Sequence, residues 1–125
     1  MIAKHRISLV GVLLASCLYG AQANAEQSQT EKNYQAYCGQ CHGMNGDGKG
    51  INVRDMSTQP RDHTDPEEMS ARSDEELFTA IKEGGQAVDK SVLMPPWEDT
   101  FTDEEIWDLV KYLRALCGCE YGKAS

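Results

Sequence analysis

The sequence predicts a small all-α domain. Three segments open with a helix-capping pattern, apolar residues at helical spacing follow them, and no segment reads as a credible strand. The 125 residues are enough for one small domain, and no internal repeat or second domain is visible. We therefore expect three main helices joined by loops.

The first two predicted helices begin at capping boxes led by serine. Residues 28–31 have the sequence Ser-Gln-Thr-Glu and open a helix that runs through Tyr34, Tyr37 and Cys38 into residues 38–42. Residues 73–76 repeat the pattern as Ser-Asp-Glu-Glu before a second apolar periodic stretch. We expect Gly84 and Gly85 to end this second helix as a left-handed cap.

The third predicted helix has the strongest periodic signal. It begins at residues 102–105, with the sequence Thr-Asp-Glu-Glu, and its apolar residues recur at helical spacing from Ile106 to Cys117. Lys111 and Arg114 lie toward its C-terminal end, where cations favour the helix dipole.

Two loops separate these helices. Residues 43–65 are rich in Gly, Asn, Asp and Pro, and residues 86–100 contain Pro95-Pro96. The glycine-rich residues 46–50 lack both a preceding strand and the spacing of a phosphate-binding loop, so we interpret them as a turn.

Residues 38–42 have the sequence Cys-Gly-Gln-Cys-His, which is the attachment sequence for a covalent c-type haem. Two thiols three positions apart on a helix lie on one face, so Cys38 and Cys41 can both form thioethers with the vinyl groups along one haem edge. His42 then lies beneath the iron, and neutral imidazole is a common haem ligand.

A bare C-x-x-C also occurs in thioredoxin-like dithiols and in zinc sites. The dithiol interpretation lacks the βαβ pattern, and the zinc interpretation needs a second pair of ligands. Cys117 and Cys119 are the only candidates for that pair, but a one-residue spacer at the end of a periodic helix suits zinc poorly. We expect these two cysteines to form a local disulfide, with a docking or redox role as the alternative.

The sixth iron ligand decides the function, because an open position allows chemistry on small molecules whereas a thioether closes it and raises the potential. Met44 is too close to His42 to reach the opposite haem face. His63 lies in a polar, acidic loop, where we expect a solvated side chain, and bis-histidine ligation is the alternative.

Met94 is the favoured sixth ligand. It precedes Pro95-Pro96, which push it out of helical conformation into a stiff extended segment that can hold a sulfur in place. Met56 and Met69 have no such local rigidity, so we expect them to fill apolar gaps.

Together these features resemble the class I monohaem cytochromes c, from about Thr30 to Leu116. The haem motif at residues 38–42 is highly specific, and the Leu-Met-Pro-Pro-Trp segment at residues 93–97 is moderately so. The glycine-rich residues 46–50 and the amphipathic last helix also match the family.

The resemblance implies a small cytochrome c fold over residues 26–119, wrapped around one covalent haem c, with residues 120–125 as a tail. It implies attachment through Cys38 and Cys41 and axial ligation of the iron by His42 and Met94.

The resemblance further implies specific contacts around the haem. The N- and C-terminal helices cross, a carbonyl such as that of Pro60 accepts a hydrogen bond from the proximal histidine, and Arg61 and Trp97 contact a propionate. The helix contacts expected on this basis join Tyr34 or Tyr37 to Trp107, Leu109 or Tyr112.

The function implied is one-electron transfer between redox partners, with no bond chemistry and no catalytic residue. Two alternatives are a cytochrome subunit of a periplasmic dehydrogenase or reductase complex, and a haem enzyme or gas sensor with a displaceable sixth ligand.

The chain is acidic, with 12 Lys and Arg residues against 20 Asp and Glu residues and a net charge of −8. Nucleic acid is excluded as a partner, because an acidic domain without a basic stripe is repelled by phosphates. Redox partners with basic docking surfaces are favoured instead.

Residues 1–25 have the features of a signal peptide. Lys4 and Arg6 form a basic start, residues 7–15 are apolar, and Ala-Asn-Ala at residues 23–25 is a cleavage site. Removing this segment takes away two cationic side chains and no acidic ones, so the net charge becomes −10. Export to the periplasm agrees with the haem motif, because bacteria attach c-type haem outside the cytoplasmic membrane.

A second cleavage site competes, since Leu-Ala-Ser-Cys at residues 14–17 resembles a lipobox. Cleavage there would leave a lipidated Cys17 and a membrane anchor. We expect the soluble form starting at Glu26, because its cleavage site lies at an ordinary signal length. Intact mass of the mature protein checks this, and a lipidated Cys17 in the membrane fraction would contradict it.

Overall fold

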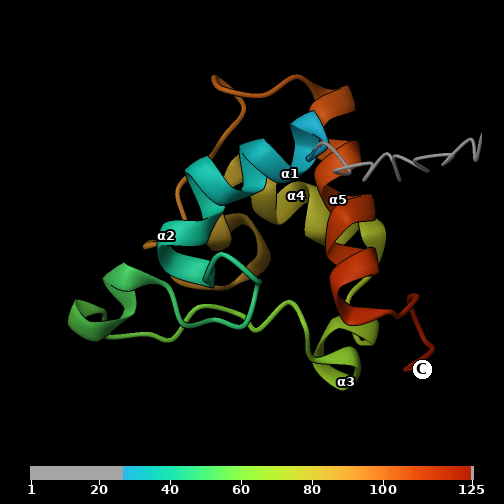
Figure 1. Cartoon of the computed structure of the whole chain (residues 1–125), viewed down its shortest axis with the longest axis horizontal. Helices are drawn as coiled ribbons and strands as arrows, with labels where there is room; N and C mark the ends of the chain where they lie inside the picture. The colour runs from blue at the N-terminus through green and yellow to red at the C-terminus, as the bar shows by residue number, and fades with distance from the viewer. Residues whose placement is uncertain (1–26, 125) are drawn as a thin grey trace, which may run out of the picture.

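The computed structural model describes residues 27–124, and its regular secondary structure consists of helices joined by long loops (Figure 1). The expected signal peptide and lipobox lie outside these residues. Within them the secondary structure contains helices and an isolated bridge between Glu120 and Lys123, but no strand, which confirms the all-α fold class. Between residues 27 and 124 we find no helix that is long and apolar enough to cross a membrane.

The N-terminal helix is continuous but changes its winding. α1 (Gln29–Asn33) passes into a π-helical turn (Tyr34–Cys38), and α2 (Gly39–His42) completes the helix. The π-turn is marked by the amide of Gly39, which donates to the carbonyl of Tyr34, five residues earlier. The predicted helix therefore reaches His42 with a wider turn just before the haem motif.

The predicted helix starts are confirmed. The side chain of Ser28 accepts a hydrogen bond from the amide of Glu31 at 3.1 Å. Ser73 caps α4 (Asp74–Glu83) in the same way, and a reciprocal capping box opens α5 (Asp103–Cys117). These side chains satisfy amides that would otherwise have no partner in the first helical turn.

Three short elements were not predicted. α3 (Pro66–Ser70) follows the expected loop, and single 3₁₀ turns occur at Ile51–Asp55 and Gly85–Val88. α3 is stabilised locally, because the carboxylate of Asp65 accepts from the amides of its first turn and proline occupies its first position. Elements of four or five residues are too short to show periodicity.

The N-terminal helix crosses α5, as expected from the family (Figure 1). The ring of Tyr34 lies 5.1 Å from that of Tyr112, which confirms one of the expected pairs. Tyr37 contacts a different partner, Trp97, at 5.6 Å. The buried core lies where α4 packs on α5 beside the N-terminal helix, and it consists mainly of Leu77, Ile81, Phe101, Ile106, Leu109, Val110 and Leu113.

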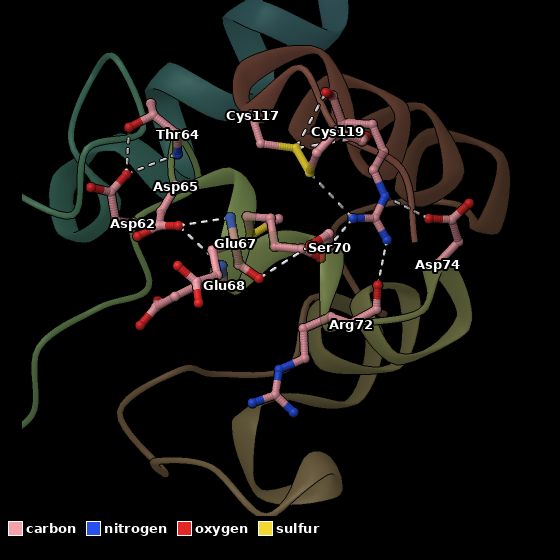
Figure 2. The surroundings of a disulfide bond; sticks show 12 residues. Asp62, Thr64, Asp65, Glu67, Glu68, Ser70, Arg72, Asp74, Cys117 and Cys119 are labelled. Atoms are coloured by element: carbon pink, nitrogen blue, oxygen red, sulfur yellow. Dashed lines mark hydrogen bonds and ion pairs between the residues drawn. A yellow bond between two sulfur atoms is a disulfide. The ribbon is translucent and has the colours of Figure 1, made fainter. Parts of the chain in front are cut away.

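Arg114 ties α3 and the start of α4 to α5 beside the cysteine pair Cys117 and Cys119, whose surroundings are drawn in Figure 2. Its guanidinium donates to the carboxylate of Asp74 and to the carbonyl of Met69, both at 2.8 Å, and also to the carbonyl of Arg72. Just beyond it the disulfide expected between Cys117 and Cys119 is formed.

We predict that Arg114→Met lowers the free energy of unfolding by about 2–3 kcal/mol, because charge-assisted hydrogen bonds to two carbonyls and a carboxylate are lost together. Urea denaturation of the holoprotein measures this change. Lys111→Met is the matched control, since Lys111 lies on the same helix and pairs only with the surface residue Asp108. Equal denaturation midpoints for the two variants would contradict the role of Arg114.

Candidate haem-binding site

A cavity of about 450 Å³ lies between the N-terminal helix, α4, α5 and the two long loops. This volume lies in the range of cofactor pockets. Cys38, Cys41, His42 and Met94 all line the cavity, so the fold brings together four residues that the sequence singled out in two distant segments.

His42 is oriented by a hydrogen bond. Its Nδ1–H donates to the carbonyl of Arg61 at 2.9 Å, which leaves Nε2 without a proton and suited to bind a metal. Burial lowers the pKa of His42 and favours the neutral ring that a ligand requires.

The prediction that the carbonyl of Pro60 accepts this hydrogen bond from His42 was wrong by one residue, because the acceptor is the carbonyl of Arg61. The carbonyl of Pro60 faces Gly48 instead, where an added Cβ would lie 3.1 Å from it. The backbone amide of His63 donates to the carbonyl of Gly46 at 2.7 Å, and this contact sets the course of the intervening chain. The carbonyl of Arg61 is therefore the one that reaches His42.

Cys38 and Cys41 are half-buried free thiols. Burial raises the pKa of the Cys38 thiol to about 12, whereas dithiol catalysis needs a depressed thiol pKa. The zinc alternative also fails, because Cys117 and Cys119 are bonded to each other. Among residues 27–124 no cluster of three or more His, Cys, Asp or Glu side chains could hold a metal ion.

Met94 is held against the end of α4 by its backbone. The amide of Gly85 donates to the carbonyl of Met94 at 3.0 Å, and a Cβ on Gly84 would lie 2.9 Å from that same carbonyl. Gly84 and Gly85 therefore permit this close approach of the two backbones. Gly84 also ends α4, where its φ is 86°. Pro95 and Pro96 follow Met94 directly and form the segment for which the sequence predicts a stiff backbone.

The other methionines differ in position. Met69 is fully buried in the core, where it fills apolar space as expected. Met44 is 54% exposed. Met56 follows the 3₁₀ turn and lines the cavity, a position that no local feature of the sequence indicates. Two methionines, Met56 and Met94, therefore line the cavity.

His63 is buried, with 8% of its surface exposed, so the expectation of a solvated side chain was wrong. Its ring stacks on that of His42 with centroids 4.1 Å apart. The polar residues beside His63 form their hydrogen bonds with one another or with α3: Thr64 donates to the carboxylate of Asp62, and Asp65 caps α3. None of these bonds uses the His63 ring, which points into the interior. A ring stacked on the face of His42 lies on the same side as that residue and not opposite it, so this geometry does not support the bis-histidine alternative.

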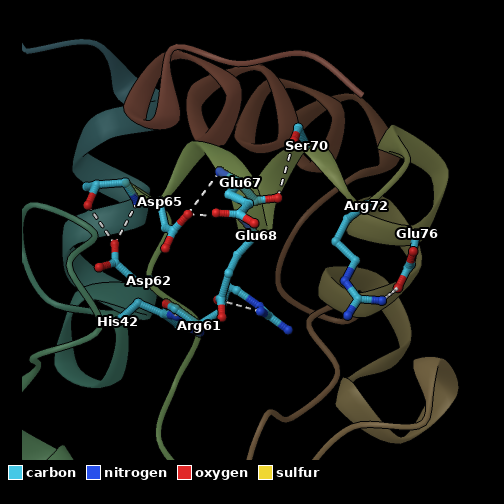
Figure 3. A network of polar contacts seen from close by, with 10 residues as sticks. His42, Arg61, Asp62, Asp65, Glu67, Glu68, Ser70, Arg72 and Glu76 are labelled. Atoms are coloured by element: carbon cyan, nitrogen blue, oxygen red, sulfur yellow. Dashed lines mark hydrogen bonds and ion pairs between the residues drawn. The ribbon is translucent and has the colours of Figure 1, made fainter. Parts of the chain in front are cut away.

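Two arginines line the cavity (Figure 3). Arg61, which the sequence indicated, pairs with Glu68, and Arg72, which it did not, pairs with Glu76 at 2.9 Å. The buried Nε of Arg72 has no hydrogen-bond partner among the described residues. A ligand that carries carboxylates, as haem does, would supply one. Together with the two thiols, a free imidazole nitrogen and a sulfur, the residues present fit haem c.

Comparison with known proteins agrees with this chemistry. Residues 25–113 match the family described as cytochrome C oxidase, cbb3-type, subunit III. The chain is similar to the KustC0563 c-type cytochrome, with 28% identity and a TM-score of 0.56, over 70% of this chain and 95% of that one.

A second similar structure is the Kuenenia stuttgartiensis reducing HAO-like protein complex Kustc0457/Kustc0458, with 29% identity and a TM-score of 0.55. The match covers 73% of this chain but only 43% of that one. No curated protein matches. The family match spans most of the chain and confirms the resemblance to monohaem class I cytochromes c, so the protein belongs to this family of c-type cytochromes.

Proposed function

We propose that this c-type cytochrome is an exported one-electron carrier that holds a single haem c, attached through Cys38 and Cys41 and ligated by His42 and Met94. The observation that carries the proposal is the shared cavity. A histidine with a free Nε2 and a methionine from a distant loop border it beside two free thiols.

Bound haem supplies an Fe(II)/Fe(III) couple, and the protein's residues set the conditions for it. The hydrogen bond from His42 to the carbonyl of Arg61 fixes the ligating tautomer. The apolar walls provide a low dielectric, and Arg61 and Arg72 offer donors to the propionates. In this scheme no residue has an acid, base or nucleophilic role, and the proposed role of the protein is electron transfer alone.

Met94 is a better sixth ligand than Met56 because its backbone is held more firmly. The Met94 amide donates to the Ser91 carbonyl and its own carbonyl accepts from Gly85, whereas the backbone of Met56 has one such bond, to Val53. A firmly held sulfur also argues against the haem enzyme or gas sensor, which needs a displaceable ligand.

A cytochrome subunit of a larger redox complex is the second candidate function. The observation that favours it is the similarity to a structure whose title names a reducing HAO-like protein complex. Purification from native membranes and periplasm separates the two functions: a free monomer supports the carrier, and a stable stoichiometric partner supports the subunit.

We predict that haem stays with the polypeptide after denaturation and extraction with acidic organic solvent, because thioether bonds survive unfolding. Cys38→Ala leaves at most one such bond and should lower the yield of holoprotein. Absorbance of the protein and solvent phases measures the distribution of haem. Haem in the organic phase would refute covalent attachment.

We predict that Met94→Ala abolishes the charge-transfer absorption from sulfur to ferric iron, lowers the reduction potential and opens the iron to external ligands. Met56→Ala is the matched control, because Met56 borders the same cavity, and all three properties should be retained. Optical redox titration measures ligation and potential together. A native spectrum in Met94→Ala with a changed one in Met56→Ala would assign the ligand to Met56.

We predict that electron exchange with a basic partner slows by about an order of magnitude or more between low and physiological ionic strength, since the mature chain carries a net charge of −10. Stopped-flow kinetics over a salt series measures this. A flat profile would indicate docking through an apolar patch instead.

A further inference from the structure

The ring of His63 stacks against one face of the proposed iron ligand and is itself tied to the N-terminal helix. We propose that His63 is a positioning residue that fixes the rotation of the His42 imidazole, and that Tyr34 holds His63 in place for this purpose. The inference rests on the proposed function, in which His42 binds the iron.

His42 is constrained along one edge and on one face. The hydrogen bond from Nδ1 to the carbonyl of Arg61 holds the edge at 2.9 Å but still permits the ring to rock about the N–H···O axis. The ring of His63 lies 4.1 Å away at an interplanar angle of 17°, which blocks that rocking on one side. Stacking therefore supplies the constraint that one hydrogen bond lacks.

His63 is immobilised in turn. Its Nδ1 shares a hydrogen bond of 2.8 Å with the hydroxyl of Tyr34, and its backbone amide donates to the carbonyl of Gly46. Tyr34 is 1% exposed and packs on Tyr112 of α5. The orientation of the proximal ligand is therefore set by the contact between the N-terminal helix and α5.

An imidazole suits this position better than an aliphatic side chain. A buried polar ring costs free energy unless it is hydrogen-bonded, and the Tyr34 hydroxyl provides that bond. The same bond fixes the ring plane of His63. A leucine would fill the space but would present no flat face to His42.

The test uses the ferric holoprotein, because the plane of an axial imidazole determines the g values of low-spin iron and the spread of the haem-methyl NMR shifts. His63→Leu removes both the flat face and the hydrogen bond, and it should change both signatures. His63→Phe keeps the flat face and should lie between His63→Leu and the wild type.

Tyr34→Phe removes only the hydroxyl that holds His63, and it should move the g values and methyl shifts in the same direction as His63→Leu. Tyr112→Phe is the matched control, since it removes a hydroxyl from the neighbouring ring that is not bonded to His63, and it should leave both signatures unchanged. If His63→Leu does not fold, Tyr34→Phe and His63→Phe decide the matter.

Two negative outcomes are distinguishable. A wild-type protein without low-spin His/Met signatures overturns the proposed function and this inference with it. A wild type with those signatures, together with folded variants whose g values and methyl shifts match it, overturns only the positioning role of His63.

Discussion

Much of this structure depends on the two contacts of Tyr34, one with Tyr112 of α5 and one with His63. Its ring packs on Tyr112 and its hydroxyl binds His63, so one buried side chain links the crossing of two helices to the proximal side of the cavity. Burial raises the pKa of Tyr34, which keeps the hydroxyl protonated and able to form this bond. Helix packing and ligand geometry are therefore not independent properties of this chain.

Features encoded by neighbouring residues could be predicted from the sequence. The capping serines and Thr102 fix the helix starts, because each bonds to an amide within its own first turn. The haem motif at residues 38–42 and the two prolines after Met94 are likewise encoded by adjacent residues. These features account for the three main helices and for the four predicted site residues, Cys38, Cys41, His42 and Met94, which are among those that line the cavity.

Features that depend on distant contacts could not be predicted. The burial of His63 follows from a partner 29 residues away, and the polar sequence around it indicates the opposite. The role of Arg72 follows from its place at the cavity wall, which no motif marks. The acceptor for His42 was displaced by one residue because the hydrogen bond from the amide of His63 to the carbonyl of Gly46 sets the course of the loop.

The two walls of the cavity differ in how firmly they are held. His42 ends a helix, its carbonyl accepts from the amide of Gly48 at 2.8 Å, and its ring is held on two sides. Met94 depends on backbone bonds to Gly85 and Ser91 within an exposed loop, where Val92 is 65% exposed. Local opening costs least where few apolar groups are buried, so the Met94 loop is held less firmly than the helix that ends at His42. In the proposed function an external ligand could replace the Met94 sulfur only after the backbone bonds to Gly85 and Ser91 had broken, so the contact of this loop with the end of α4 would keep the sixth position closed.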